Sequence, residues 1–122
     1  MEAVRLLGTG AASVFGAGRA ASYHGRVTTD LVHEPDASRY ALYIDGELAA
    51  LADYVVQGDI VSFNHTFTQP SRRGQGLAGR VVAFAMDDVE ATSTRAVSPD
   101  CWYVGNWFAK HPDRANLLRV RA

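Results

Sequence analysis

The sequence predicts a single α+β domain in which helices pack on a mainly antiparallel sheet. Two observations carry this prediction. Residues 27–68 contain four runs with the alternating or β-branched pattern of strands, separated by short turns. After residue 76 the apolar spacing changes to that of a helix, and a short strand and a second helix follow. The expected order is β-β-β-β-α-β-α, and 122 residues fit one domain.

The sequence contains four strand segments, of which the last three are expected to form a meander. The four segments are RVTTDLVHE, RYALYID, ELAALADYVVQ and IVSFNHTFT. Pro35 stops the first segment because proline cannot donate to a sheet. Asp45-Gly46 separates the second and third segments and is typical of a tight hairpin turn, since glycine accepts a positive φ. Gly58-Asp59 marks the next turn. Short turns of this kind join antiparallel neighbours.

A helix is expected to begin after Gly76 and to end near Thr92. Its apolar positions fall at i, i+4, i+7 and i+8, as one face of a helix requires. They are Leu77, Val81, Phe84, Ala85 and Val89. The segment TRAVS then reads as a short buried strand beside the meander.

The segment SPDCWYVGNWFAKHP predicts a second helix. Ser98 would cap its N-terminus and Pro99 would be its first residue, a good start signal, while Pro112 would close it. His111 would interact with the last carbonyls. We expect its aromatic residues to pack in the core; they are Trp102, Tyr103, Trp107 and Phe108.

Composition narrows the class of protein. Apolar residues make up 48% of the chain and charged residues 20%, as in a globular domain with a core. The net charge of −1 argues against partners such as nucleic acid or an acidic membrane surface. The single cysteine excludes an internal disulfide and fits a reducing compartment, so we expect a cytoplasmic protein. The cysteine and four histidines show no metal-ligand spacing.

Residues 1–26 differ in composition from the domain at residues 27–122. They are rich in alanine, glycine and serine, and we expect a poorly ordered leader. Gly8, Gly10, Gly16 and Gly18 would interrupt the amphipathic helix that a transit peptide needs.

The stretch SRRGQGLAGR, at residues 71–80, joins the last meander strand to the first helix. A helix N-terminus presents unpaired N–H groups, glycines admit close approach of a ligand, and two arginines add positive charge. This pattern predicts a phosphate or pyrophosphate site, although similar turns occur without ligands. A nucleotide-hydrolysing P-loop is disfavoured, because Arg80 and Val81 stand where that motif needs lysine and a magnesium-binding hydroxyl.

Arg73, Gly76 and Ala78 give the pattern R-x-x-G-x-A. This resembles the signature of the GNAT acyltransferase superfamily, in which loop amides hold the pyrophosphate of coenzyme A. The resemblance covers roughly residues 29–118 and includes the DGE hairpin, the His65-Thr66 pair late in a strand, and the cysteine, tyrosine and His-Pro positions of the last helix. The chain is similar to a small, single-domain GNAT-like subfamily with a cysteine after the last core strand.

The resemblance implies a protein that transfers the acetyl group of acetyl-CoA to an amine, without a metal. In this superfamily two neighbouring strands splay apart and hold the pantetheine arm, and the phosphates lie on the glycine loop. The cofactor-binding residues so implied are Thr66, Phe67, Thr68, Arg73, Gly74, Gln75, Gly76, Leu77 and Ala78.

Two residues are candidates for the chemistry. The expected helix start favours the Cys101 thiolate, whereas Asp100 opposes it, and a lone cysteine is also often a small core residue. With the resemblance, we hypothesise that Cys101 accepts the acyl group or lines the acyl pocket. His65 is the best general-base candidate, because imidazole titrates near neutral pH; the alternative is a histidine that only hydrogen-bonds within the sheet.

A non-catalytic module that binds CoA or a protein partner stays open as the alternative function. A chain of 122 residues leaves little room for an acceptor-binding subdomain. The kind of amine and the oligomeric state are not encoded in any motif that we find.

Overall fold

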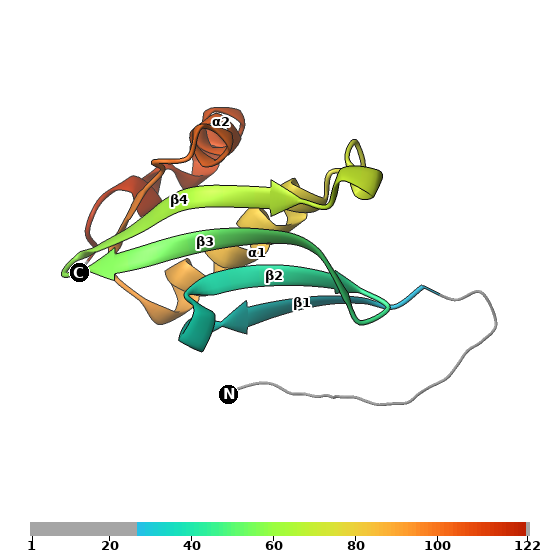
Figure 1. Ribbon diagram of the computed structural model, residues 1–122. Coiled ribbons are helices and arrows are strands. Elements are labelled where there is room, and N and C mark those ends of the chain that lie inside the picture. Colours follow the sequence, from blue (N-terminus) through green and yellow to red (C-terminus); the bar gives the residue numbers. More distant parts are fainter. Residues whose placement is uncertain (1–26, 122) are drawn as a thin grey trace.

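The structure is a computed structural model that describes residues 27–121, so the leader expected at residues 1–26 lies outside the described part. One five-stranded sheet carries the fold, in the order β1-β2-β3-β4-β5. Figure 1 shows α1 behind the strands and α2 beyond β4, at the edge of the sheet. The arrangement is the α+β layer expected from the sequence.

The elements follow the expected order β-β-β-β-α-β-α. The strands are β1 (Thr29–Glu34), β2 (Arg39–Ile44), β3 (Glu47–Gln57), β4 (Ile60–Thr68) and β5 (Ala96–Ser98), and the helices are α1 (Leu77–Thr92) and α2 (Trp102–Lys110). Three short 3-10 turns complete the described part: η1 (Pro35–Ala37), η2 (Pro70–Arg72) and η3 (Pro112–Leu118). Strands β1 to β4 are antiparallel neighbours, and β5 pairs with β4 in parallel.

The hairpin turn between β2 and β3 has the backbone that its sequence predicts. Asp45 and Gly46 have φ of 51° and 80°. Positive φ at both central residues is the geometry that matches the right-handed twist of paired strands. Residues 45–46 therefore fix the register of the hairpin, and the expected meander is confirmed.

Strand β4 contains a β-bulge. Tyr54 of β3 pairs with Phe63, but the preceding residue of β3, Asp53, pairs with His65, so Asn64 is an extra residue without a partner on β3. An extra residue shifts the alternation of side chains by one position. Phe63 points into the core and is fully buried, whereas His65 is exposed. The bulge therefore changes which face each later side chain of β4 occupies.

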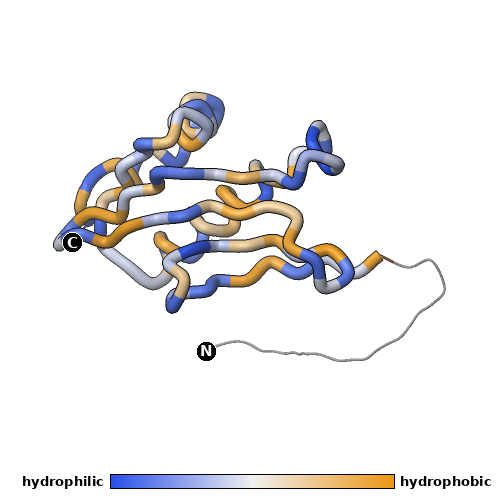
Figure 2. Tube along the Cα trace, in the orientation of Figure 1, coloured by the Kyte–Doolittle hydropathy of each residue, from blue (hydrophilic) through white to orange (hydrophobic). Residues whose placement is uncertain are grey.

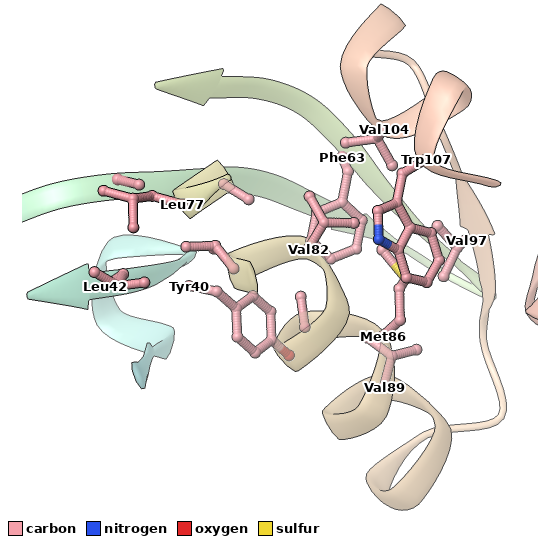
Figure 3. Close-up of a cluster of buried hydrophobic side chains, with 14 of the residues drawn as sticks. Tyr40, Leu42, Phe63, Leu77, Val82, Met86, Val89, Val97, Val104 and Trp107 are labelled. Carbon is pink, nitrogen blue, oxygen red and sulfur yellow. The ribbon is translucent and has the colours of Figure 1, made fainter. Parts of the chain in front are cut away.

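The core lies between the sheet and the two helices. Figure 3 shows Phe63 of β4 among buried side chains of α1, Val82 and Met86, and of α2, Val104 and Trp107. The stripe expected for α1 is largely confirmed, although Phe84 is only partly buried. Removal of these side chains from water is the main force that holds the helices to the sheet.

Helix α2 begins later than the sequence predicts. Ser98 is the last residue of β5, where it pairs with Ser62, and the Cys101 amide donates to the Phe63 carbonyl at 2.9 Å. Residues 99–101 therefore continue along β4 in extended form, and Cys101 itself, with ψ of 131°, is the N-cap. The expectation that Ser98 caps the helix and that Pro99 begins it is wrong, because pairing with β4 outweighs the local start signal.

The aromatic residues of α2 divide into two groups. Trp107 and Phe108 are buried, and Tyr103 packs against the core, as expected. Trp102 is 78% exposed, so the prediction that it packs in the core is wrong. As the first helical residue, it lies at the end of α2 rather than on the face turned to the sheet. The His111 imidazole lies 2.7 Å from the Trp107 carbonyl, which confirms its helix-end role.

No helix in the described part of the chain combines the length and the apolar character needed to cross a bilayer.

Candidate functional site

Strands β4 and β5 diverge after a short paired segment. Three residues of each strand are paired, up to Ser62 and Ser98, and the Cys101 amide makes one further bond to β4. The chain then leaves the sheet as α2, so residues 64–68 of β4 have no strand partner on that side among the described residues. We call this segment the open edge of β4. It matches the splayed strand pair that the resemblance implies.

Main-chain groups at the open edge alternate in direction. The Gln69 amide donates to the Ala49 carbonyl of β3 at 2.8 Å. Because N–H and C=O groups of successive residues point to opposite sides of a strand, those of Thr66 and Thr68 point away from β3. Two residues therefore offer donors and acceptors to a ligand that lies along the open edge.

The glycine loop follows the open edge directly. Gly74 and Gly76 have φ of 84° and 74°, and a Cβ on either would meet no protein atom within 4 Å. Glycine is therefore required by the backbone, and the space above the loop is open. Figure 2 shows the segment after β4 as largely hydrophilic.

Three main-chain amides at the N-terminus of α1 have no hydrogen-bond acceptor within the helix and lie next to this loop. The first hydrogen bond within the helix runs from the Arg80 amide to the Gly76 carbonyl at 3.2 Å. The amides of Leu77, Ala78 and Gly79 precede it, and no side chain caps them. Unpaired amides together with the positive end of the helix dipole make an anion-binding site. Leu77 and Ala78 have buried side chains, so they can contribute only their main chain.

The two arginines of the loop differ in their contacts. Arg72 donates to the Gln69 side chain at 3.1 Å and lies 3.8 Å from Glu47, so it ties the loop to the β2–β3 turn. Arg73 forms no ion pair with any residue that the structure describes. Its charge is therefore available to an anion on the loop.

Cys101 lies at the other end of the open edge. Its sulfur is 3.7 Å from the Thr66 hydroxyl. Partial burial raises the pKa of the thiol, but the Thr66 hydroxyl and the amides of Tyr103, Val104 and Thr66 together lower it further than burial raises it. The Cys101 side chain does not make a hydrogen bond that caps α2. The surrounding dipoles nevertheless favour the thiolate form of the side chain.

Asp100, which the sequence predicts to oppose the thiolate, is not among the groups that shift the pKa of Cys101. Its carboxylate accepts hydrogen bonds from the Ser62 and Ser98 hydroxyls. These bonds lower the pKa of Asp100 and orient its carboxylate toward the two serines. The serine contacts form because residues 98–101 stay extended beside β4.

His65 does not share the face of Cys101. Its Nδ1 lies 2.9 Å from Asp53 Oδ2 of β3, on the face of the sheet opposite to the core. Thr66 and Cys101 lie on the helix side of the same strand. The structure thus brings Thr66 to Cys101, and places the two candidates for the chemistry, His65 and Cys101, on opposite sides of β4.

Asp53 is a site residue that the sequence analysis missed. The turn at Gly58-Asp59 alone would pair Asp53 with Asn64, and only the bulge moves it to His65. No local signal in the sequence places a bulge at Asn64.

The sheet is mainly antiparallel, with one parallel pair that diverges, and a glycine loop leads from it to a helix N-terminus. This combination is the fold of the GNAT class of acyltransferases. A family model described as GCN5-related N-acetyl-transferase matches residues 39–117. The match spans more than half of the chain, and the protein belongs to this family.

Solved structures include a similar protein, the ribosomal-protein-S18-alanine N-acetyltransferase from Escherichia coli. The two are 23% identical, with a TM-score of 0.45, over 48% of this chain and 38% of that one. The comparison with curated proteins gives no match. Within residues 27–121, no group of three His, Cys, Asp or Glu side chains is arranged to hold a metal ion.

Proposed function

We propose that the protein is an N-acetyltransferase that transfers the acetyl group of acetyl-CoA to an amine. One observation carries the proposal: the unpaired amides of the glycine loop, the open edge of β4 and the Cys101 thiol follow one another along a single line. Such a line suits a ligand with phosphates at one end, an amide-containing arm in the middle and a reactive acyl group at the far end. A cytoplasmic location fits this activity.

The phosphate end would lie on residues 73–78. The loop amides and the first turn of α1 would hold the pyrophosphate of CoA, and Arg73 would add charge. Arg73, Gly74, Gln75, Gly76, Leu77 and Ala78 form this group.

The pantetheine arm would follow Thr66, Phe67 and Thr68. The main chains of Thr66 and Thr68 point to the open edge, and Phe67 lies between them, paired with Leu51 of β3. A ligand there would complete the hydrogen bonds of the strand as a further strand would.

His65 would take the proton that the attacking amine loses, acting from the face of β4 opposite to Cys101. The amine nitrogen forms a bond to the thioester carbonyl carbon, the carbon–sulfur bond breaks, and the sulfur leaves as a thiolate that takes a proton from solvent to become the thiol of CoA. Cys101 has two roles open to it. Its thiolate would attack the carbonyl first and carry the acetyl group to the amine, or its side chain would only line the acyl pocket.

Calorimetry with CoA and the release of free CoA in the presence of amines test the proposal together. We expect binding of CoA and acetyl-CoA, and CoA release that depends on the amine. Binding without release with any amine would identify the alternative, a non-catalytic CoA-binding module. Absence of binding would overturn the proposal, as would equal thermal stabilisation by ATP, because only a ligand of the native state raises stability.

Intact mass after incubation with acetyl-CoA decides the role of Cys101. An acetyl adduct on the wild-type protein that is absent in Cys101→Ser supports the covalent route. No adduct, together with full activity in Cys101→Ser, contradicts it and leaves the pocket-lining role.

A further inference from the structure

Asp53 and His65 form a pair across the middle of the sheet. They are direct cross-strand partners on β3 and β4, and Asp53 Oδ2 lies 2.9 Å from His65 Nδ1. Directly opposite side chains on antiparallel strands stand on one face, about 5 Å apart at Cβ. The sheet backbone, rather than a flexible loop, therefore sets the geometry of the pair.

The bulge at Asn64 creates this pair. Before it, the register pairs Gln57 with Ile60 and Tyr54 with Phe63; continued without a bulge, it would pair Asp53 with Asn64. His65 would then follow Phe63 onto the core face. The extra residue brings His65 to the face of Asp53 and leaves Thr66 on the face of Cys101.

The other charged groups around the pair are already engaged. Arg39 of β2 is the cross-strand neighbour of Asp53 on its far side, but its guanidinium donates to Glu34 at 2.6 Å and to the Tyr43 hydroxyl at 3.4 Å. On the other side of β4, Asp100 accepts from two serine hydroxyls. Among the described residues, His65 is thus the hydrogen-bond partner of the Asp53 carboxylate.

A carboxylate on Nδ1 has a defined effect on an imidazole. It accepts a hydrogen bond from Nδ1–H, so the neutral ring keeps its proton on Nδ1 and carries its lone pair on Nε2. Nε2 has no hydrogen-bond partner within residues 27–121, and the His65 side chain is 60% exposed, so an amine can reach it.

We propose that Asp53 is a positioning residue that holds His65 in the tautomer and orientation of a general base. The inference rests on the proposed acetyl transfer. In that reaction the amine nitrogen bonds to the acetyl carbon, the carbon–sulfur bond breaks with its electron pair on sulfur, and the amine proton moves to His65 Nε2 and from there through solvent to the CoA thiolate. Asp53 touches neither substrate; it acts through Nδ1.

The first test needs no activity. Long-range ¹H–¹⁵N spectra of neutral His65 should show the proton on Nδ1 in the wild-type protein, and Asp53→Ala should lower the Nδ1–H share. Asp53→Asn keeps the volume of the side chain and serves as a second variant. Asp30→Asn, which changes an exposed carboxylate on β1, is the matched control and should leave the His65 spectrum unchanged. A wild-type ring protonated on Nε2, or one unaffected by Asp53→Ala, would overturn the proposal.

The second test uses the acetyl transfer. Asp53→Ala should lower kcat roughly 10- to 100-fold, a part of the 10²–10⁴-fold that a general base contributes, while the Kd for CoA stays unchanged. In a protein that already carries His65→Gln, Asp53→Ala should not lower kcat any further. An equal loss in both backgrounds would show that Asp53 acts elsewhere. If the wild-type protein transfers no acetyl group, the proposed function fails, whereas the tautomer test still decides the role of Asp53.

Discussion

Cys101 is a half-buried thiol that two parts of the chain surround with dipoles. The Thr66 hydroxyl comes from β4, and the amides of Tyr103 and Val104 come from the first turn of α2. Burial alone would raise the pKa of the thiol, so the lowered pKa depends on these groups. The sequence predicts that a helix start activates this cysteine, but the contribution of Thr66 appears only when β4 and α2 are placed together.

Substitution of Thr66 by valine should make the Cys101 thiolate less stable. The change removes the hydroxyl and keeps the shape, so the pKa of the thiol should rise toward its ordinary value. The thiolate is the reactive form, and the midpoint of the pH dependence of alkylation should therefore move to higher pH. Alkylation by iodoacetamide, followed by intact mass from pH 6 to about 10, a range that brackets an ordinary thiol, measures this midpoint.

Thr29→Val is the control for this measurement. Thr29 is exposed at the start of β1, remote from Cys101 in the sheet. Its substitution should leave the midpoint unchanged. An unchanged midpoint in Thr66→Val would contradict the role of the hydroxyl.

At the scale of elements, the loop that enters α1 combines two requirements. Its glycines hold φ values that other residues rarely adopt, and its amides stay unpaired at the start of the helix. A helix capped by a serine or aspartate side chain would be more stable but would have fewer free amides. The loop is therefore suited to an anion at some expense in helix stability.

The substitutions Gly76→Ala and Gly79→Ala should change the free energy of unfolding by amounts that differ in sign or size. At Gly76, with φ of 74°, alanine should lower the free energy of unfolding by about 1–2 kcal/mol. Gly79 has ordinary helical φ, and a Cβ there would lie 3.4 Å from the Tyr103 hydroxyl. Helix propensity favours alanine at that position by up to about 1 kcal/mol, so stability should stay equal or rise. Urea denaturation measures both, and equal losses would contradict this assignment of roles.

Elements set by local sequence were predicted well. The bounds of β3 and β4 and the end of α1 match, because glycine-containing turns and the change of apolar period fix them within a few residues. The start of α2 and the β4 bulge were not predicted. Both depend on pairing between segments that are remote in the chain, residues 98–101 with β4 and β3 with β4, and no local pattern encodes that pairing.

At the scale of the whole molecule, a polar cluster joins distant parts of the fold on the core side of the sheet. His33 of β1 hydrogen-bonds the Tyr54 hydroxyl of β3 at 2.7 Å and stacks on Tyr40 of β2, while Tyr40 donates to Asp88 of α1 at 2.6 Å. Burial lowers the pKa of His33 below its ordinary 6.5, and the charge of Asp88, 3.5 Å away, offsets this only in part. The neutral ring is therefore the form that the fold prefers.

The stability of the protein should fall on mild acidification. Because the pKa of His33 is lower in the folded state than in the unfolded chain, the unfolded chain binds more protons below about pH 6.5. The stabilisation is complete above that pH and is lost as the pH falls toward the folded-state pKa. Melting temperatures between pH 7.5 and 5 should decline less in His33→Gln than in the wild-type protein. Parallel declines would show that other groups dominate.

The overall architecture follows from the sequence, since the meander, the amphipathic helix and the small size leave few arrangements. The candidate site follows only in part. Its loop and its cysteine can be read from motifs, whereas the partner of His65 depends on a register that the folded sheet alone reveals.

Asn64 is the residue that the ladder between β3 and β4 leaves without a partner. Its exposed side chain can be exchanged without disturbing the strand, and its deletion would remove the bulge while Phe63 stays opposite Tyr54 and His65 stays opposite Asp53. Substitution scans and scans of single-residue deletions should therefore both rate position 64 as tolerant. A homologous chain that lacks one residue at this point would carry the same side chains on the same faces of a regular strand.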